Sequence, residues 1–177
     1  FPKDIKAIIY TAKEAGVDPV LLDAVEKRNQ CQKERIFDYI RKKYGSGLKE
    51  KIFTIWGLSF KPGTDDMREA PSINLITSII EAGGLVHAFD PVANEEAAKK
   101  FPTEWIDGGT LQFYDDNYSA LENTDALVLM TEWKMFRNPS LSKMKKLMQN
   151  FCIFDGRNQY DPEIMKKNGF EYKGIGR

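Results

Sequence analysis

The sequence has few of the residues that mark several common kinds of site. It contains two cysteines, Cys31 and Cys152, and one histidine, His87, with no CxxC spacing, so no metal site is predicted. The scarcity of cysteine indicates a reducing compartment, and we expect a cytoplasmic protein. No apolar run approaches the roughly 20 residues of a membrane span, and the first residues, Phe1-Pro2-Lys3-Asp4, show no signal-peptide pattern. A membrane partner is therefore not expected.

The sequence also lacks net charge. Lys plus Arg number 26 and Asp plus Glu number 26, so no overall field favours nucleic acid, and an anionic ligand has to be held by local charges. A dinucleotide-binding GxGxxG run is absent too. The length of 177 residues and the hydrophobic share of 42% fit one ordinary domain with a helical appendage.

The first part of the chain has helical periodicity. Apolar residues recur at helical spacing in residues 5–15, and Pro19 opens a second helix at residues 20–43, which ends at Gly45. The middle of this long helix, residues 26–35, is polar on nearly all sides, which is typical of an exposed helix that bridges two domains or two subunits. We divide the chain into a helical and dimerisation region, residues 1–47, and a second domain, residues 48–177.

In the second domain, short apolar runs alternate with helical stretches. The runs indicate strands at residues 52–56, 85–89, 111–114, 126–130 and 151–154. Helices are predicted near residues 72–82, 94–100, 118–121 and 141–149. Alternation of this kind indicates right-handed crossovers between parallel strands, so the predicted class is α/β with a doubly wound parallel sheet.

The loop after the first predicted strand is the richest in candidate binding residues. It runs from Gly57 to Pro71, contains Lys61 and Arg68, and is followed by a helix. Open parallel sheets bind ligands beyond the carboxyl ends of their strands, and helix amino ends attract anions, so this loop is a candidate phosphate site. The alternative is a surface loop with solvated charges, and the residues alone leave both interpretations open.

Two later strand ends carry further candidates. Asp90 either bonds a ribose hydroxyl or forms a turn, and turn chemistry favours the second interpretation. Arg157 follows the last predicted strand, where its guanidinium would clamp a carboxylate, a diphosphate or a uracil edge. The alternative for this arginine is an ion pair with Asp155 or Asp161. His87 lies inside a predicted strand and is interpreted as structural.

Five segments of the chain together carry a resemblance to a known family. They are Phe1-Pro2-Lys3-Asp4, the stretch from Gly57 to Ser72, Ala88-Phe89-Asp90-Pro91, the stretch from Asp125 through Thr131-Glu132-Trp133, and Asp155-Gly156-Arg157-Asn158 before Asp161-Pro162. In this order and spacing they resemble the UDP-glucose/GDP-mannose dehydrogenase family over essentially the whole chain. The resemblance implies a central helical region that pairs subunits into a homodimer, then a carboxyl-terminal Rossmann-like domain for the nucleotide sugar. It also implies an NAD domain outside this sequence.

The resemblance further implies a reaction. Members of the family oxidise the C6 alcohol of a nucleotide sugar to a carboxylate by two hydride transfers to NAD, through a thiohemiacetal and a thioester on a cysteine. That cysteine stands immediately before the Phe-Pro-Lys-Asp segment, so we expect a fragment that binds a UDP-sugar without turning it over. The segment favours UDP-glucose as substrate, with GDP-mannose and UDP-N-acetylmannosamine as alternatives. A non-catalytic interaction or dimerisation module is the alternative of a different class.

Individual roles follow from the resemblance, residue by residue. Asp4 matches a catalytic carboxylate beside the thiolate, which suits general acid–base work. Phe60 and Lys61 match substrate-binding positions, and Arg157 matches an arginine that contacts the UDP-sugar. Arg68 matches an arginine that reaches NAD held by the other domain.

Overall fold

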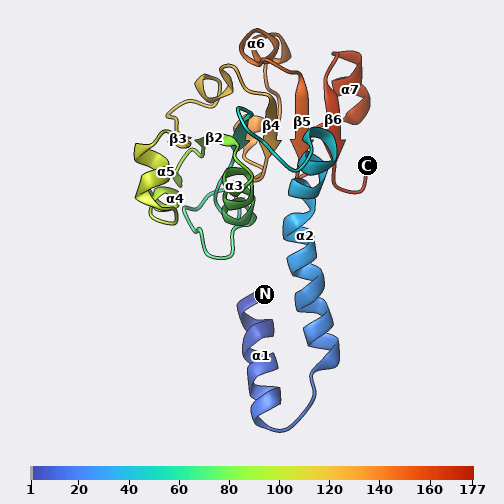
Figure 1. The fold of residues 1–177 in the computed structure, drawn as a ribbon. Coiled ribbons are helices and arrows are strands. Elements are labelled where there is room, and N and C mark those ends of the chain that lie inside the picture. Colours follow the sequence, from blue (N-terminus) through green and yellow to red (C-terminus); the bar gives the residue numbers. More distant parts are fainter. Residues whose placement is uncertain (1) are drawn as a thin grey trace.

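The chain folds into a six-stranded parallel sheet from which a helical hairpin projects (Figure 1). The computed structural model describes residues 2–177, and Phe1, the first residue of the Phe1-Pro2-Lys3-Asp4 segment, lies outside this range. The strands, in the order β3-β2-β1-β4-β5-β6, are β1 (Ile52–Trp56), β2 (Leu85–Phe89), β3 (Leu111–Phe113), β4 (Ala126–Leu129), β5 (Cys152–Asp155) and β6 (Glu171–Gly174). This topology confirms the predicted α/β class and the doubly wound parallel sheet.

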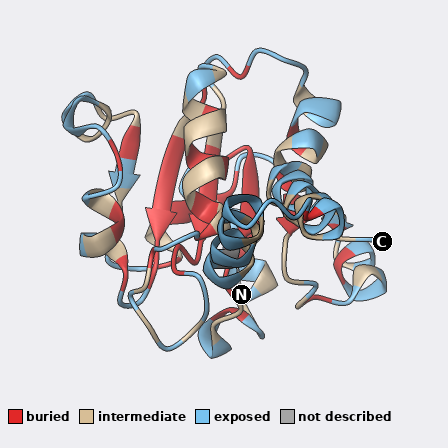
Figure 2. Cartoon of the chain, turned by 90° about the horizontal axis from the view of Figure 1, so that it is seen from below, coloured by how far each residue is buried: buried red, intermediate tan, exposed pale blue. Residues whose placement is uncertain are grey.

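Helices cover both faces of the sheet. The helices of the described residues are α1 (Pro2–Glu14), α2 (Val20–Tyr44), α3 (Pro71–Glu81), α4 (Asn94–Ala98), α5 (Thr103–Asp107), α6 (Leu141–Leu147) and α7 (Pro162–Lys167), with 3-10 turns η1 (Ser119–Leu121) and η2 (Lys134–Phe136). Of these, α1 and most of α2 form the projecting hairpin and do not cover the sheet (Figure 1). Side chains alternate along each strand. Phe53 and Ile55 therefore pack with α3, α4 and the end of α2, whereas Trp56 packs with η1, η2, α6 and α7. Figure 2 shows the central strands buried between these layers.

The structure contains four short elements that the sequence did not predict: α5, η2, α7 and β6. Strand β6 is an edge strand with exposed Glu171 and Lys173, so it has no apolar run to mark it. Helix α7 spans six residues, and its side-chain cap is Asp161, which accepts hydrogen bonds from the backbone N–H groups of Glu163 and Ile164. Elements this short give too few apolar repeats for a periodicity signal.

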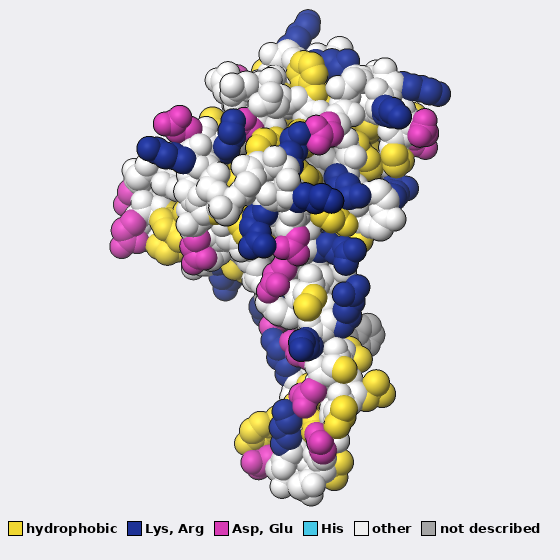
Figure 3. Space-filling model, turned by 45° about the vertical axis from the view of Figure 1, so that its right-hand side comes forward, with side chains coloured by type: hydrophobic (Ala, Val, Ile, Leu, Met, Phe, Trp, Pro, Cys, Tyr) yellow, Lys and Arg dark blue, Asp and Glu magenta, His cyan; other side chains and the backbone are white. Residues whose placement is uncertain are grey.

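The hairpin of α1 and α2 differs from the rest of the molecule in its burial. Ile36 and Ile40, near the end of α2, join the sheet core, but residues 26–35 contain no buried side chain, as predicted from their polarity. No side chain of residues 3–14 is buried either. Apolar side chains are exposed toward the far end of the hairpin, among them Tyr10 (67%) and Leu21 (76%) (Figure 3). Within residues 2–177, no helix is both long and apolar enough to cross a membrane.

Candidate functional site

The candidate site lies where the winding of the sheet reverses. Strands β1 and β4 are neighbours, and the chain builds β2 and β3 on one side of them and β5 and β6 on the other. Ligands of open α/β sheets bind in the crevice outside the carboxyl ends of the strands at this point. The loops that follow β1, β4 and β5 meet here, and they contain Phe60, Lys61 and Arg157.

The loops after β1 and β4 are in close backbone contact. Gly57 has φ +87°, and a Cβ at this position would lie 2.5 Å from the Cβ of Thr131, so only glycine fits without a shift. Two residues on, the Thr131 hydroxyl donates a 2.7 Å hydrogen bond to the carbonyl of Ser59. Thr131 is fully buried, so this bond is shielded from water and fixes one loop against the other.

Asp90, at the end of β2, ties a third loop to the same edge. One of its carboxylate oxygens accepts from the backbone N–H of Leu58 at 2.8 Å and from Trp133 Nε1 at 3.1 Å. The other accepts from the backbone N–H groups of Val92 and Ala93, each at 3.0 Å. The carboxylate is buried and forms the turn expected from its position, so Asp90 acts as a scaffold residue rather than as a ribose ligand.

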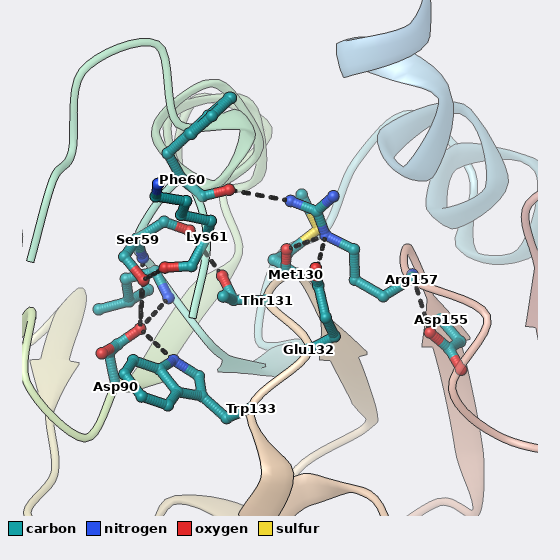
Figure 4. Close-up of polar contacts among 11 residues, drawn as sticks. Ser59, Phe60, Lys61, Asp90, Met130, Thr131, Glu132, Trp133, Asp155 and Arg157 are labelled. Atoms are coloured by element: carbon teal, nitrogen blue, oxygen red, sulfur yellow. Dashed lines mark hydrogen bonds and ion pairs between the residues drawn. The ribbon is translucent and has the colours of Figure 1, made fainter. Parts of the chain in front are cut away.

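Arg157 joins the loops after β1, β4 and β5. Its Nε donates to the carbonyl of Met130 at 2.7 Å, and its Nη2 lies 3.4 Å from the carbonyl oxygen of Phe60 (Figure 4). Glu132 Oε2 lies 3.2 Å from Nε. The ion pair expected as an alternative, with Asp155 or Asp161, does not form in the structure, because Asp155 accepts from the backbone N–H of Arg157 and leaves the guanidinium to Glu132.

A cavity of about 380 Å³ opens beside Arg157, between α2 and the edge of the sheet. Its wall combines apolar and polar side chains, among them Asn29, Gln32 and Lys33 of α2 with Phe60, Met130 and Arg157. Pro71, the first residue of α3, also lines it. The positive end of that helix dipole therefore adds to the attraction of an anion toward this cavity.

Lys61 lies at the same edge as Arg157, with the backbone of Phe60 between them (Figure 4). Its side chain is exposed, and among the described residues it has no carboxylate within ion-pair distance and does not line the cavity beside Arg157. The loop that carries it is closed by a 2.9 Å hydrogen bond from the N–H of Phe60 to the carbonyl of Asp66. Lys61 thus offers an exposed positive charge on a closed loop.

Arg68 is further along this loop and is 83% exposed. Its Nε and Nη2 donate to the two carboxylate oxygens of Asp66 at 2.9 and 2.8 Å, and these bonds hold the pKa of Asp66 well below its usual range. A second cavity, of about 450 Å³, lies between Arg68, Glu96 and Lys100. Arg68 therefore lines a different cavity from the one beside Arg157.

Asp4 comes from a different part of the fold. It lies in the first turn of α1 and is exposed. The hairpin is joined to the loop after β1 by Glu69, whose two carboxylate oxygens meet Lys6 of α1 at 2.7 Å and Lys33 of α2 at 2.5 Å. Phe60, Lys61 and Arg157 thus lie at one edge of the sheet (Figure 4). The helix that carries Asp4 is joined to the loop after β1 through the ion pairs of Glu69.

The cysteines and the histidine do not add to this site. Cys152 is buried, and burial raises the pKa of its thiol to about 11, while Cys31 is an exposed residue of α2. His87 is buried in β2 with Nδ1 3.0 Å from the carbonyl of Ala120, and desolvation lowers its pKa. This placement agrees with the structural interpretation of the histidine.

Sequence reasoning assigned no role to Glu132 or Glu69. Glu132 stands in the Thr131-Glu132-Trp133 segment that carries part of the resemblance, and its position just after β4 was the available signal. Glu69 likewise stands in the stretch from Gly57 to Ser72 that carries part of the resemblance, but nothing in the sequence indicated that its backbone has φ +59°, which is uncommon for a residue with a side chain. Their roles depend on lysines and an arginine that are distant in the sequence.

Comparisons with known proteins agree with this geometry. Residues 54–162 match the family model described as "UDP-glucose/GDP-mannose dehydrogenase family, UDP binding domain". The whole chain is 45% identical to a UDP-glucose 6-dehydrogenase of Pseudomonas aeruginosa and 37% identical to UDP-glucose 6-dehydrogenase TuaD of Bacillus subtilis. It spans 39% and 37% of their lengths. A solved UDP-glucose dehydrogenase of Pyrobaculum islandicum superimposes with TM-score 0.78 at 25% identity, over 99% of this chain and 36% of the other.

Proposed function

This chain belongs to the UDP-glucose/GDP-mannose dehydrogenase family, and we propose that it is the part of a UDP-glucose 6-dehydrogenase that holds the UDP end of the nucleotide sugar. The observation that carries the proposal is the placement of Arg157. Its guanidinium spans the crevice where the winding of the sheet reverses, next to a cavity, and it is already oriented by the carbonyl of Met130. A guanidinium held in this way suits the bidentate recognition of a diphosphate.

The other candidate residues receive roles that fit their surroundings. Lys61 supplies a second positive charge to the diphosphate, and Phe60 forms the wall between the two cations. Asp4 supplies the carboxylate for proton transfer at the reacting end of the sugar. We place the boundary between helical region and UDP-binding domain at residues 47 and 48. The two free cysteines fit a reducing compartment, and we propose a cytoplasmic location.

NAD is the proposed cofactor, held mainly by a domain other than this one. When bound, NAD would accept the hydride. The fit of this chain to NAD rests on Arg68, whose guanidinium is exposed beside a polar cavity. Asp66 already occupies its Nε and Nη2, so Arg68 would offer only the remaining N–H groups to a phosphate. Its role is to add charge at the border of this domain.

UDP-glucose is the proposed sugar because both curated relatives above are UDP-glucose 6-dehydrogenases. Neither cysteine of the described residues is placed as the nucleophile, since Cys152 is buried with a raised pKa and Cys31 is exposed on α2 and does not line the cavity of Arg157. We therefore expect the 177-residue chain to show no NAD reduction with UDP-glucose. Spectrophotometry at 340 nm tests this expectation, and reduction by the purified chain would contradict it.

Binding of UDP to the purified chain is the decisive experiment. Isothermal titration calorimetry should show weak binding, and Arg157→Ala should reduce the affinity roughly 10- to 100-fold, the scale of a hydrogen bond to a charged group. Lys61→Ala should have a smaller effect, roughly threefold to tenfold, because its ammonium is exposed. Arg137→Ala is the matched control, since Arg137 is an exposed arginine outside the cavity of Arg157. Absence of heat at millimolar UDP would contradict the proposal.

Self-association is the second proposed property, because the hairpin exposes Ile8, Tyr10 and Leu21. We propose a homodimer through α2. Light scattering across a concentration series should show a dimer in the unaltered chain and a shift toward monomer in Leu21→Glu. A pure interaction module, the rival interpretation, would keep the dimer and show no UDP affinity for Lys61→Ala or Arg157→Ala to reduce.

A further inference from the structure

Glu69 occupies an unusual position between the two parts of the molecule. Its backbone adopts φ +59°, a left-handed conformation that costs about 1–2 kcal/mol for a residue with a Cβ. The residues around it, Met67 and Ala70, are 3% and 1% exposed, so the segment is anchored in the core. The conformation of Glu69 therefore directs a carboxylate outward from a fixed backbone, toward the hairpin.

Both carboxylate oxygens of Glu69 form ion pairs. Oε1 lies 2.7 Å from Nζ of Lys6, and Oε2 lies 2.5 Å from Nζ of Lys33. The two lysines belong to different helices of the hairpin. Lys33 first and then Lys6 lower the pKa of Glu69 to about 2, so the network is charged at neutral pH.

The network matters because it joins α1 directly to the loop after β1, whereas the ion pairs of Lys6 with Glu26 and of Lys13 with Asp23 join α1 to α2. No described side chain of α1 is buried, so its hydrophobic anchoring is small, and the helix extends along α2 away from the sheet (Figure 1). Asp4 stands two residues before Lys6, about 3 Å along the helix axis. A movement of Lys6 relative to Glu69 therefore moves Asp4 relative to Lys61, which shares the loop of Glu69.

We propose that Glu69 is a positioning residue for the reaction: it sets the distance between the helix that carries Asp4 and the loop that carries Lys61. This inference rests on the proposed function. Glu69 does not touch the substrate in this scheme. It acts through Lys6 and Lys33, so its loss should disturb the alignment of the reacting end of the sugar more than the binding of the UDP end.

The test is a separation of kcat from KM in the complete enzyme that contains this chain. Glu69→Gln should lower kcat roughly 10- to 100-fold, the scale of a misplacement near 1 Å, while KM for the nucleotide sugar stays within about threefold. Glu171→Gln is the matched control, because Glu171 also joins a lysine of α2, Lys43, to the domain of the sheet and lines neither the cavity of Arg157 nor that of Arg68. An unchanged kcat, or equal changes in both variants, would overturn the inference.

A distance measurement in the 177-residue chain tests the positioning role of Glu69 without an activity assay. Spin labels introduced by Tyr10→Cys and Lys166→Cys, with Cys31→Ser, report the distance from α1 to the domain of the sheet. The unaltered Glu69 background should give a narrow distribution, and Glu69→Gln a broader one, whereas Glu171→Gln should leave it narrow. If Glu69→Gln does not fold, Lys6→Met removes the contact of α1 with Glu69 from an exposed helix position, together with the longer contact of Lys6 with Glu26 on α2.

The inference and the proposed function fail in different ways. A loss of UDP affinity in Glu69→Gln as large as in Arg157→Ala would show that Glu69 acts in binding and would overturn its positioning role. Absence of UDP binding by the unaltered chain would instead contradict the proposed function. Equal distance distributions in the unaltered and Glu69→Gln chains would overturn the positioning role alone.

Discussion

At the carboxyl edge of the sheet, Thr131 is fully buried and bonds the carbonyl of Ser59 at 2.7 Å, whereas residues 3–14 of the hairpin have no buried side chain. The first region is fixed by hydrogen bonds shielded from water and by close backbone contact. The second is held by ion pairs that solvent reaches, such as Lys6 with Glu69 and Lys13 with Asp23. The proposed binding residues therefore lie on a rigid edge, and the proposed catalytic carboxylate lies on a part of the molecule that is easier to move.

The sharpest test of this difference compares two glycines. Gly57 and Gly16 both have positive φ, +87° and +72°, but a Cβ on Gly57 would meet Thr131 whereas one on Gly16 would meet nothing within 4 Å. Gly57→Ala should lower the free energy of unfolding by about 2–5 kcal/mol, from backbone strain plus overpacking. Gly16→Ala should cost about 1–2 kcal/mol, from strain alone. Urea denaturation measures both, and equal losses would contradict a rigid edge.

A smaller effect is expected at Thr131. Thr131→Val keeps the shape of the side chain but leaves the buried carbonyl of Ser59 without its donor, so stability should fall by about 1–3 kcal/mol. Thr131→Ser retains the hydroxyl and is the control.

In the hairpin, Asp23→Asn removes the partner of Lys13, whose side chain is 57% exposed, and should change stability by less than about 1 kcal/mol. A cost for Asp23→Asn as large as that for Thr131→Val would remove the contrast between the regions.

The smallest effect concerns pH. Because Lys33 and Lys6 depress the pKa of Glu69 from 4.5 to about 2, the contribution of this carboxylate is fully present above its unfolded-state pKa. This contribution to stability declines as the pH falls below 4.5 and is lost once the pH has fallen through about 2, whereas the ion pairs themselves persist until the folded-state carboxylate is protonated near pH 2. Spin labels on α1 and α7 should therefore report the same distance distribution at pH 7 and at pH 3. Broadening with a midpoint near pH 4.5 would show that the lysines do not hold Glu69 as the structure indicates.

Much of the fold was predictable because the buried strands are apolar runs. Helix α2 and strands β1, β2 and β4 lie within about one residue of their predicted bounds. Strand β6 was not predictable, since at an edge only every second residue needs to be apolar and Glu171 and Lys173 face solvent. The α5 and α7 helices, with five and six residues, are too short to show helical periodicity.

The candidate site was predictable only in part. Arg157 and Lys61 stand in the loops that follow β5 and β1, where parallel sheets place their ligands, so position along the chain pointed to them. The partner of Arg157 was not predictable, because the neighbouring Asp155 and Asp161 were the nearest acids in sequence and Glu132 comes from another loop. The same holds for Glu69, which is 63 residues from Lys6 and 36 from Lys33.

The sequence by itself determined the layered α/β class, the long exposed helix and the family resemblance, because apolar periodicity and local motifs are properties of neighbouring residues. Only the tertiary structure decided which acid pairs with which base at the edge of the sheet and how the helix of Asp4 is tied to the loop of Lys61. Ion pairs depend on distances of a few ångström between segments far apart in the chain. Such distances exist only once the sheet has set its strand order.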